Sequence, residues 1–190
     1  MYRYYLRWSK KGLFERMVHR LSKRRAEQVY RIIDGSHVKV HQDACHRTEG
    51  QPDQVFGKTK GGRNTKLHAL VDASGKPLKV MLLSGQEAEV RTARELLGNV
   101  RKKIVLADKG YDSDALRDEI ARSRGFALIP GRKNRKREVL YVKSIGRKRH
   151  VVENFFARIK RFRRVATRYD RLASSYLGFV HLASASLWLR

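Results

Sequence analysis

The sequence predicts an α/β fold in which a mixed β-sheet is flanked by helices. Runs rich in β-branched and aliphatic residues alternate with segments whose apolar residues recur at helical spacing. Two of these runs, 67–72 and 78–84, are joined by Ala73-Ser74-Gly75-Lys76-Pro77, a segment typical of a hairpin turn. The chain has 190 residues, 41% of them hydrophobic, which is enough for one domain with a sizeable core.

The remaining elements follow from the same patterns. A short helix within residues 1–28 precedes a strand at 29–40, which Asp34-Gly35 is expected to interrupt, and a long polar loop at 42–64. Beyond the hairpin we expect helices at 87–99, 113–124 (with Ser113 as N-cap), 148–163 and 171–189, and strands at 103–108 and 126–130. The basic run 131–138 is either a DNA-facing loop or solvated surface. This order of elements is that of a ribonuclease-H-like fold.

The charge of the chain points to a polyanionic partner. There are 44 Lys and Arg residues against 18 Asp and Glu, a formal net charge of +26. Nucleic acid is the commonest partner of such a protein, because phosphate contacts release counterions. A protein that binds phosphate and does nothing else would have the same composition.

Three acidic residues stand out against this basic background. Asp34 and Asp108 each end an apolar run, and Glu153 lies in a helix-patterned segment rich in Arg and Lys. Carboxylates at the ends of neighbouring strands can share a cation, and a third from a covering helix would complete a site for two divalent ions. Each acid could equally be a surface charge or a turn former.

The helix-patterned segment 148–163 has two distinct faces. Arg149, Glu153 and Lys160 are four and seven residues apart, so they lie on one side of a helix. The apolar residues Phe155, Ile159 and Phe162 are expected to be buried on the other. Such a helix would present an acid between two phosphate-binding cations.

The chain resembles the DDE transposases of bacterial insertion sequences. Three runs carry the resemblance: Ile33-Asp34-Gly35-Ser36-His37-Val38, Ala107-Asp108-Lys109-Gly110-Tyr111-Asp112 and Arg149-(x3)-Glu153-(x6)-Lys160. The last is similar to the Tyr-x2-Arg-x3-Glu-x6-Lys motif of the insertion sequence five type. Segments 57–66 and 160–170 are similar as well, so the resemblance covers roughly residues 25–172.

The resemblance implies a ribonuclease-H-like catalytic domain that cuts DNA with two Mg²⁺ ions, which Mn²⁺ could replace. Water would cleave the strand at the end of the element, and the freed 3′-hydroxyl would attack target DNA. Asp34, Asp108 and Glu153 would be the catalytic metal ligands, and the DNA-binding residues would be Tyr111, Arg149, Lys160, Arg161, Arg163 and Arg164. The implied partners are the terminal inverted repeats, target DNA and further copies of the chain, in the cytoplasm at the nucleoid.

Two departures from the family pattern leave an alternative open. Gly146 stands three residues before Arg149, where the motif has Tyr; Tyr141 is near but out of register. Residues 1–28 form a basic arm similar to the end of a longer N-terminal region, ahead of a catalytic domain at 29–172 and a C-terminal helix at 173–190. The alternatives are a truncated remnant that only binds DNA, or a nuclease of the same fold that cuts branched DNA.

Other chemistries find little support in the sequence. The single cysteine, Cys45, excludes an intramolecular disulfide, and together with His41 and His46 it supplies too few ligands for a structural zinc site. Gly61-Gly62 is not followed by Gly-Lys-Ser/Thr, so a nucleotide-binding loop is not indicated. No apolar stretch is long enough for a membrane span, and none is expected.

Overall fold

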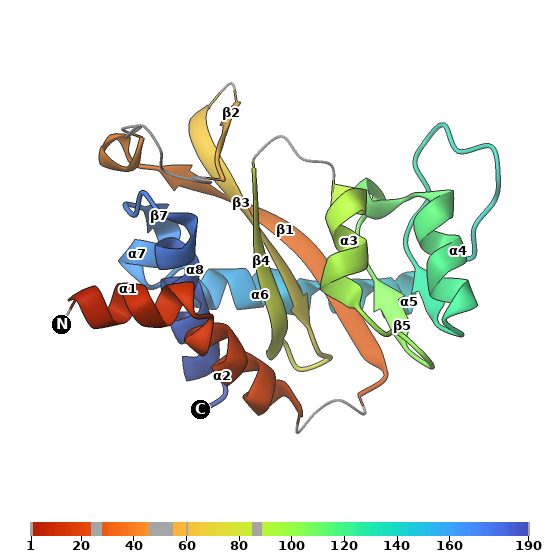
Figure 1. Ribbon diagram of the computed structural model, residues 1–190. Coiled ribbons are helices and arrows are strands. Elements are labelled where there is room, and N and C mark those ends of the chain that lie inside the picture. Colours follow the sequence, from red (N-terminus) through yellow and green to blue (C-terminus); the bar gives the residue numbers. More distant parts are fainter. Residues whose placement is uncertain (1, 24–27, 46–54, 60, 85–88, 190) are drawn as a thin grey trace.

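A mixed β-sheet runs through the centre of the molecule (Figure 1). The computed structural model describes residues 2–23, 28–45, 55–59, 61–84 and 89–189. Within these ranges seven strands form one sheet. They are β1 (Tyr30–Val40), β2 (Gly57–Thr59), β3 (Gly62–Val71), β4 (Pro77–Ser84), β5 (Ile104–Leu106), β6 (Phe126–Leu128) and β7 (Thr167–Arg168).

The sheet combines antiparallel and parallel pairs. β3 is antiparallel to β1 on one side and to β2 and β4 on the other. β1 is parallel to β5, which is parallel to β6, and the short β7 pairs in parallel with the far end of β1. The β3–β4 hairpin and the mixed α/β sheet predicted from the sequence are both present.

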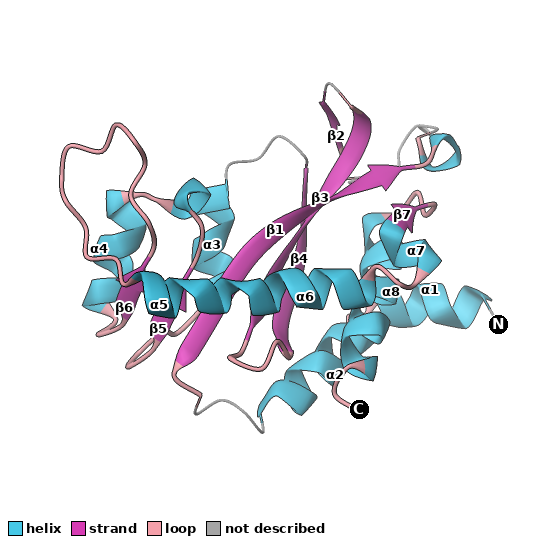
Figure 2. Cartoon of the chain, turned by 180° about the vertical axis from the view of Figure 1, so that it is seen from behind, coloured by secondary structure: helices cyan, strands magenta, loops and turns pink. Residues whose placement is uncertain are grey.

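Helices cover both faces of this sheet (Figures 1 and 2). The α-helices are α1 (Tyr2–Lys10), α2 (Leu13–Ser22), α3 (Glu89–Leu97), α4 (Asp114–Arg122), α5 (Lys143–Gly146), α6 (His150–Ile159), α7 (Arg163–Ala166) and α8 (Ala173–Ser186). Short 3-10 helices are η2 (Gln42–Ala44), η3 (Lys109–Tyr111) and η4 (Arg147–Arg149). Figure 2 shows α5 and α6 as one nearly continuous rod across the sheet.

Alternation along the strands divides the core into two layers. Ile32 and Val38 of β1 pack toward α6 and α8, as does Leu106 of β5. Ile33 and Val105 point to the opposite face, where α3 and α4 cover them. Since successive side chains of a strand point to opposite faces, this pattern fixes which residues can reach α6.

Strand β1 and the segment after it differ from the prediction. Asp34-Gly35 does not interrupt β1, because both residues are paired with β3, Asp34 opposite Ala69 and Gly35 opposite His68. A Cβ at Gly35 would lie 2.9 Å from side-chain atoms of His68 and Lys66, so glycine here permits close packing rather than a turn. The prediction of one long loop at 42–64 was also wrong in part, because β2 and the start of β3 lie within this segment. Its residues 46–54 and 60 are outside the described part of the chain.

The helix expected at 148–163 ends earlier than its pattern indicates. Helix α6 ends at Ile159, and Phe162 is the N-cap residue of α7. The prediction that Phe162 is buried was wrong, because its side chain is 45% exposed, whereas Phe155 and Ile159 are buried as expected. Ser113 does lie at the N-cap of α4, but its side chain makes no capping hydrogen bond.

The N-terminal helices pack on the C-terminal helix rather than on the sheet alone. The Tyr5 hydroxyl of α1 donates to the Ser175 carbonyl oxygen (2.5 Å), and its ring lies 4.5 Å from that of Phe179 in α8. Within the described residues, no helix is both long enough and apolar enough to cross a membrane.

Candidate active site and nucleic-acid interface

Asp34 lies within β1, and Asp108 lies just beyond the end of the adjacent parallel strand β5. β1 and β5 are parallel with Ile32 opposite Leu106, and each acid lies two residues further along. The backbone at Asp108 is still extended (φ −82°, ψ 175°), so its side chain keeps the alternation of β5. Neighbouring strands are about 5 Å apart. The register therefore directs both carboxylates to the face that α6 covers.

Local hydrogen bonds orient the two carboxylates. Asp108 is the N-cap of η3, and its Oδ1 accepts a hydrogen bond from the Gly110 backbone N–H (2.8 Å). Asp34 Oδ1 accepts one from the Gly35 backbone N–H (2.8 Å). Each carboxylate keeps a second oxygen, Oδ2, that these bonds do not use.

Glu153 reaches the same region from above the sheet. It lies in the first turn of α6, four residues after Arg149. Arg149 Nη2 is 3.5 Å from Glu153 Oε1 and 3.9 Å from Asp34 Oδ2, so one guanidinium nitrogen lies between the two acids. The Nε atom of Arg149 is buried, and none of the described residues accepts a hydrogen bond from it.

The three acids fit a divalent metal in their chemistry, but their side chains are not yet placed to share one. Carboxylate oxygens are the ligands that Mg²⁺ prefers, and the Arg149 guanidinium shows that a cation can sit between Asp34 and Glu153. The side chains do not converge in this conformation: among the described residues, no three His, Cys, Asp or Glu side chains lie close enough together to hold a metal ion. Glu153, whose side chain is 59% exposed, would have to turn inward and Arg149 would have to move aside.

Lys160 joins the end of α6 to the acid-bearing strand. Its Nζ donates to Ser36 Oγ (2.8 Å) and to the His37 carbonyl oxygen (2.9 Å). Ser36 is two residues after Asp34 and therefore on the same face of β1. Desolvation by burial lowers the pKa of Lys160. The two cations expected on this helix thus lie at either end of it, both against β1.

The three arginines after Lys160 are all exposed, but two of them also make internal contacts. Arg164 Nη2 is 3.0 Å from Asp170 Oδ1, and its guanidinium lies 4.2 Å from the centre of the Phe179 ring. Arg163 lies 5.9 Å from the centre of the Tyr169 ring. Arg161 therefore differs from its neighbours in having no such contact among those described.

Tyr111 is placed differently from what the resemblance implies. Its side chain is fully buried, and its hydroxyl is 3.0 Å from Nδ1 of His68, which is itself buried. A side chain with no exposed surface cannot contact DNA in this conformation, so the structure does not bring Tyr111 to the surface with the other predicted site residues. Burial, then the nearby Lys66 and His37, lower the pKa of His68 to about 4. Nδ1 of a neutral His68 can accept a hydrogen bond from the Tyr111 hydroxyl. This contact holds the turn that follows Asp108 against the sheet.

Gly146 and Tyr141 are in direct contact. A Cβ at Gly146 would lie 2.6 Å from Cζ of the Tyr141 ring, closer than packed atoms allow. Tyr141 therefore occupies the space that a side chain at 146 would fill, three residues before Arg149. The contact fixes the start of the α5–η4–α6 rod.

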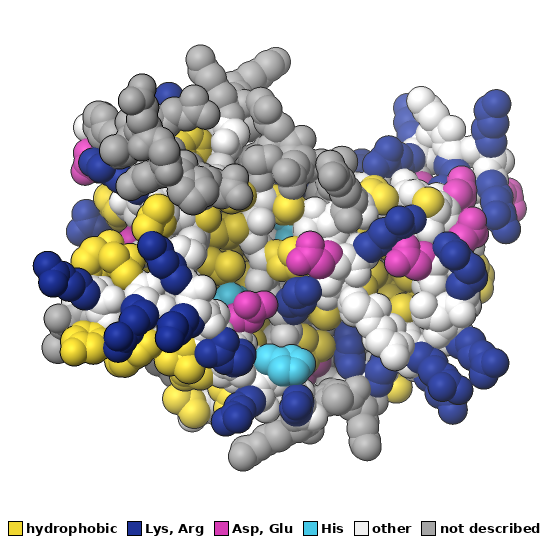
Figure 3. Space-filling model, in the orientation of Figure 1, with side chains coloured by type: hydrophobic (Ala, Val, Ile, Leu, Met, Phe, Trp, Pro, Cys, Tyr) yellow, Lys and Arg dark blue, Asp and Glu magenta, His cyan; other side chains and the backbone are white. Residues whose placement is uncertain are grey.

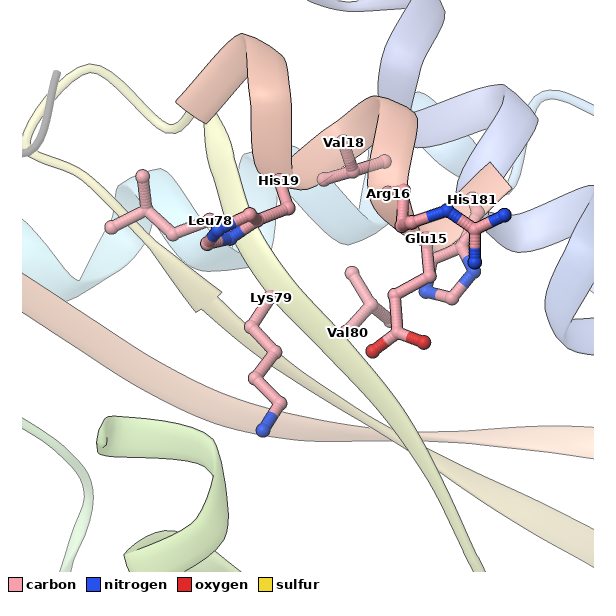
Figure 4. A pocket seen from close by; sticks show the side chains of 8 residues that line it. All are labelled: Glu15, Arg16, Val18, His19, Leu78, Lys79, Val80 and His181. Atoms are coloured by element: carbon pink, nitrogen blue, oxygen red, sulfur yellow. The ribbon is translucent and has the colours of Figure 1, made fainter. Parts of the chain in front are cut away.

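A pocket elsewhere in the molecule is separate from these residues (Figure 4). It has a volume of about 350 Å³ and lies between α2, β4 and α8. Glu15 reaches over its floor near Val80, while His19 and Lys79 lie at the other end. Desolvation lowers the pKa of His181 at its wall. None of the acids or cations that point to metal or DNA chemistry lines this pocket.

Comparisons with known proteins identify the family of this chain. The family described as "Transposase DDE domain" matches residues 25–188. The chain belongs to the DDE transposases. A protein named as a transposase of insertion sequence element IS6501 of Brucella ovis is 38% identical over 128 residues, covering 66% of this chain and 98% of that protein. Another, named for element IS402 of Burkholderia cepacia, is 29% identical over 147 residues, covering 67% of each chain.

A solved structure supports the fold assignment. The piggyBac transposase, in a synaptic complex with hairpin DNA, superposes with a TM-score of 0.52 at 10% sequence identity, over 83% of this chain. The match spans 45% of that protein's length. At this identity the likeness shows the ribonuclease-H-like fold alone. The family match and the two relatives support the resemblance to insertion-sequence transposases that the sequence motifs indicated.

The structure also brings out a carboxylate that sequence patterns did not identify in this transposase. Asp112 is buried and lies four residues after Asp108, in contact with Arg117 and Arg135. Its partners are 5 and 23 residues away along the chain. No local spacing signals such a cluster; the only hint was its place within the second motif.

Proposed function

We propose that this transposase cleaves DNA strands at insertion-sequence ends with divalent metal ions and joins the freed 3′-hydroxyl to target DNA. The observation that carries the proposal is the shared face: Asp34 and Asp108 each lie two residues beyond the paired Ile32 and Leu106, and one nitrogen of Arg149 lies between Asp34 and Glu153. The IS6501 and IS402 relatives, named as transposases of insertion elements, support this choice of substrate.

The three acids are assigned as ligands of Mg²⁺, for which Mn²⁺ can substitute. Asp34 is held within β1 and Asp108 at the end of β5, each by a backbone hydrogen bond, whereas the exposed Glu153 side chain would turn inward to close the site. A divalent cation held by these acids would act as a Lewis acid on the phosphate and would lower the pKa of the attacking water or 3′-hydroxyl. Carboxylates fixed in or directly after a strand need little reorganisation at the moment of reaction, which suits Asp34 and Asp108 to this role.

Cations along α6 would position the DNA. Arg149 has a buried N–H without an acceptor among the described residues, so it can donate to a phosphate once it leaves the acids. Lys160 links α6 to β1 through two hydrogen bonds. Its third ammonium proton could be donated to a DNA phosphate. Arg161, Arg163 and Arg164 extend the positive surface, and Arg164 must leave Asp170 to contribute fully.

We further assign residues 29–172 to the catalytic unit, with the basic arm 1–28 and the C-terminal helix 173–190 as its support. The contact between Tyr5 and Ser175 holds the arm on that helix. Action as a homo-oligomer on DNA belongs to this proposal, with terminal inverted repeats and target DNA as partners. The chain would meet both kinds of DNA at the nucleoid, in the cytoplasm.

The test compares isosteric variants in cleavage and strand-transfer assays. Asp34→Asn, Asp108→Asn and Glu153→Gln are each expected to abolish Mg²⁺-dependent cleavage of element-end DNA while DNA binding, followed by fluorescence anisotropy, is retained. Asp118→Asn, an exposed acid on α4, is the matched control and should cleave normally. Wild-type cleavage by any of the three site variants would remove that residue from the assignment.

The same assays separate the proposal from its two alternatives. A remnant that only binds DNA would yield no cleavage with Mg²⁺ or Mn²⁺, and the match over residues 25–188 argues against it. A nuclease for branched DNA would cut without joining. Products in which the element end is covalently joined to a target plasmid distinguish a transposase from that nuclease.

A further inference from the structure

The basic loop, which we define as residues 131–138, projects from the body of the molecule (Figure 1). Its sequence contains five Lys or Arg residues and ends at Glu138. Lys133, Lys136 and Arg137 are exposed, and Figure 3 shows Lys and Arg side chains around the projecting lobe on the α4 side.

Two of its cations are used to anchor the loop. Arg135 Nη1 donates to Asp112 Oδ1 (2.7 Å), and Arg135 also pairs with Asp114. The Arg132 backbone N–H donates to Asp112 Oδ2 (2.9 Å), while its side chain donates to the carbonyl oxygens of Lys109 (3.2 Å) and Gly110 (2.9 Å). Both ends of Arg132 are therefore fixed to the turn after Asp108.

The anchoring carboxylate is buried and fully engaged. The Asp112 side chain is 1% exposed, and it accepts hydrogen bonds from Arg117 Nε (3.0 Å) and Nη2 (2.9 Å) as well. Burial opposes its ionisation, but hydrogen bonds from the Arg132 backbone, Arg117 and Arg135 prevail and lower the pKa of Asp112. Charge-assisted hydrogen bonds of this kind hold the base of the loop in one geometry.

The anchor also sets the place of the loop. The residues that hold it, 109–112, directly follow Asp108, and the loop itself follows β6, the parallel neighbour of β5. Because the carboxyl ends of parallel strands meet at one edge of a sheet, the loop rises from the edge where Asp108 lies. The base of the loop is therefore held beside Asp108, whereas Arg137 lies on the α4 side, in a pocket that Asp114 and Asp118 also line.

We propose that the basic loop is a preformed clamp for the phosphate backbone of duplex DNA next to the catalytic acids. It rests on the proposed function, because that function requires DNA at this edge. Lys133 and Lys136 are exposed on the loop, and Arg137 adds a third exposed cation on its α4 side. The acids near its base, Asp112 and Asp114, are already paired with Arg135. An ordered loop loses less conformational entropy on binding than a free one, so the anchor strengthens each phosphate contact.

The salt dependence of DNA binding measures the clamp directly. In the variant Lys133→Ala/Lys136→Ala/Arg137→Ala, the slope of log K against log salt should fall by about 2–3, because each lost phosphate contact removes about 0.9. Affinity for a short duplex of arbitrary sequence should drop at least about 10-fold at moderate salt. The matched control Arg101→Ala/Lys102→Ala/Arg124→Ala removes the same charge from exposed residues ahead of β5 and β6, at the opposite edge. Its slope should change by less than half as much.

A cross-linking measurement tests the position. In a Cys45→Ser background, Asn134→Cys carrying a benzophenone should cross-link to duplex DNA, whereas Arg124→Cys with the same label should not. Equal slopes for the two triple variants, or no cross-link from position 134, would overturn the clamp. Selective loss of binding to an acidic protein, with DNA binding unchanged, would overturn it as well.

The outcomes separate the clamp from the proposed function. If the slope does not change in the loop variant but cleavage still needs Asp34, only the clamp is refuted. If the slope falls as expected but Asp34→Asn cleaves normally, only the catalytic assignment is refuted.

Discussion

Arg149 is expected to compete with metal for Asp34 and Glu153, two of the acids proposed to be catalytic, and its removal should strengthen metal binding. The guanidinium nitrogen lies 3.9 Å from Asp34 and 3.5 Å from Glu153, so both carboxylates must release it before they can bind a divalent ion. At an effective dielectric constant of about 20, each contact corresponds to about 4 kcal/mol. Solvent screening reduces the net value to about 0.5–1 kcal/mol, because Glu153 is 59% exposed.

This energy sets the size of the effect. In Arg149→Gln the dissociation constant for Mn²⁺, measured by calorimetry without DNA, should fall about 2- to 5-fold. Arg147→Gln is the control: it removes the same charge from an exposed neighbour that makes no ion pair with the acids among those described. DNA cleavage by Arg149→Gln should nevertheless fall, because a phosphate donor is lost. Unchanged or weaker Mn²⁺ binding in Arg149→Gln than in the control would refute the reasoning.

Three further predictions concern packing and charge around the site. Gly146→Ala should lower the free energy of unfolding by about 1–3 kcal/mol through contact with Tyr141, and the cost should vanish in a Tyr141→Ala background; equal costs in both backgrounds would contradict the contact. The folded-state pKa of His68 is about 4, below the ordinary 6.5, so the unfolded chain binds this proton first and stability should fall by up to about 3 kcal/mol as pH drops from 6.5 toward 4. Urea titrations should show a flatter pH profile for His68→Gln, and parallel profiles would exclude His68 as the cause. Asp112→Ala should lower the free energy of unfolding by about 3–5 kcal/mol, because it leaves Arg117 and Arg135 without their buried acid. It should also speed tryptic cleavage of the basic loop. An unchanged melting temperature would count against this anchor.

Asp34 shows how local signals and strand pairing can disagree. Asp-Gly is a common turn pair, which is why the sequence predicted an interruption there. The structure keeps the strand because β3 pairs with it on both sides of Gly35, and the missing Cβ makes room for Lys66 and His68. Tertiary hydrogen bonds outweighed the local preference.

Tyr111 and Asp112 show a second limit. Both belong to the motif around Asp108, and nothing in that run distinguishes a side chain that contacts DNA from one that supports the fold. Only burial shows which of these side chains support the fold: Tyr111 contacts His68, and Asp112 accepts a hydrogen bond from Arg135, 23 positions away. Such partners cannot be found from spacing along the chain.

The sequence by itself determined the α/β class, the hairpin, the basic character and the three motifs, because periodicity, turn chemistry and charge are local properties. Only the tertiary structure decided that Asp34 lies within a strand, that Tyr111 is buried, and that Arg149 stands between Asp34 and Glu153. These depend on strand register and on the path of α6 across the sheet, which arise from contacts between residues far apart in the chain.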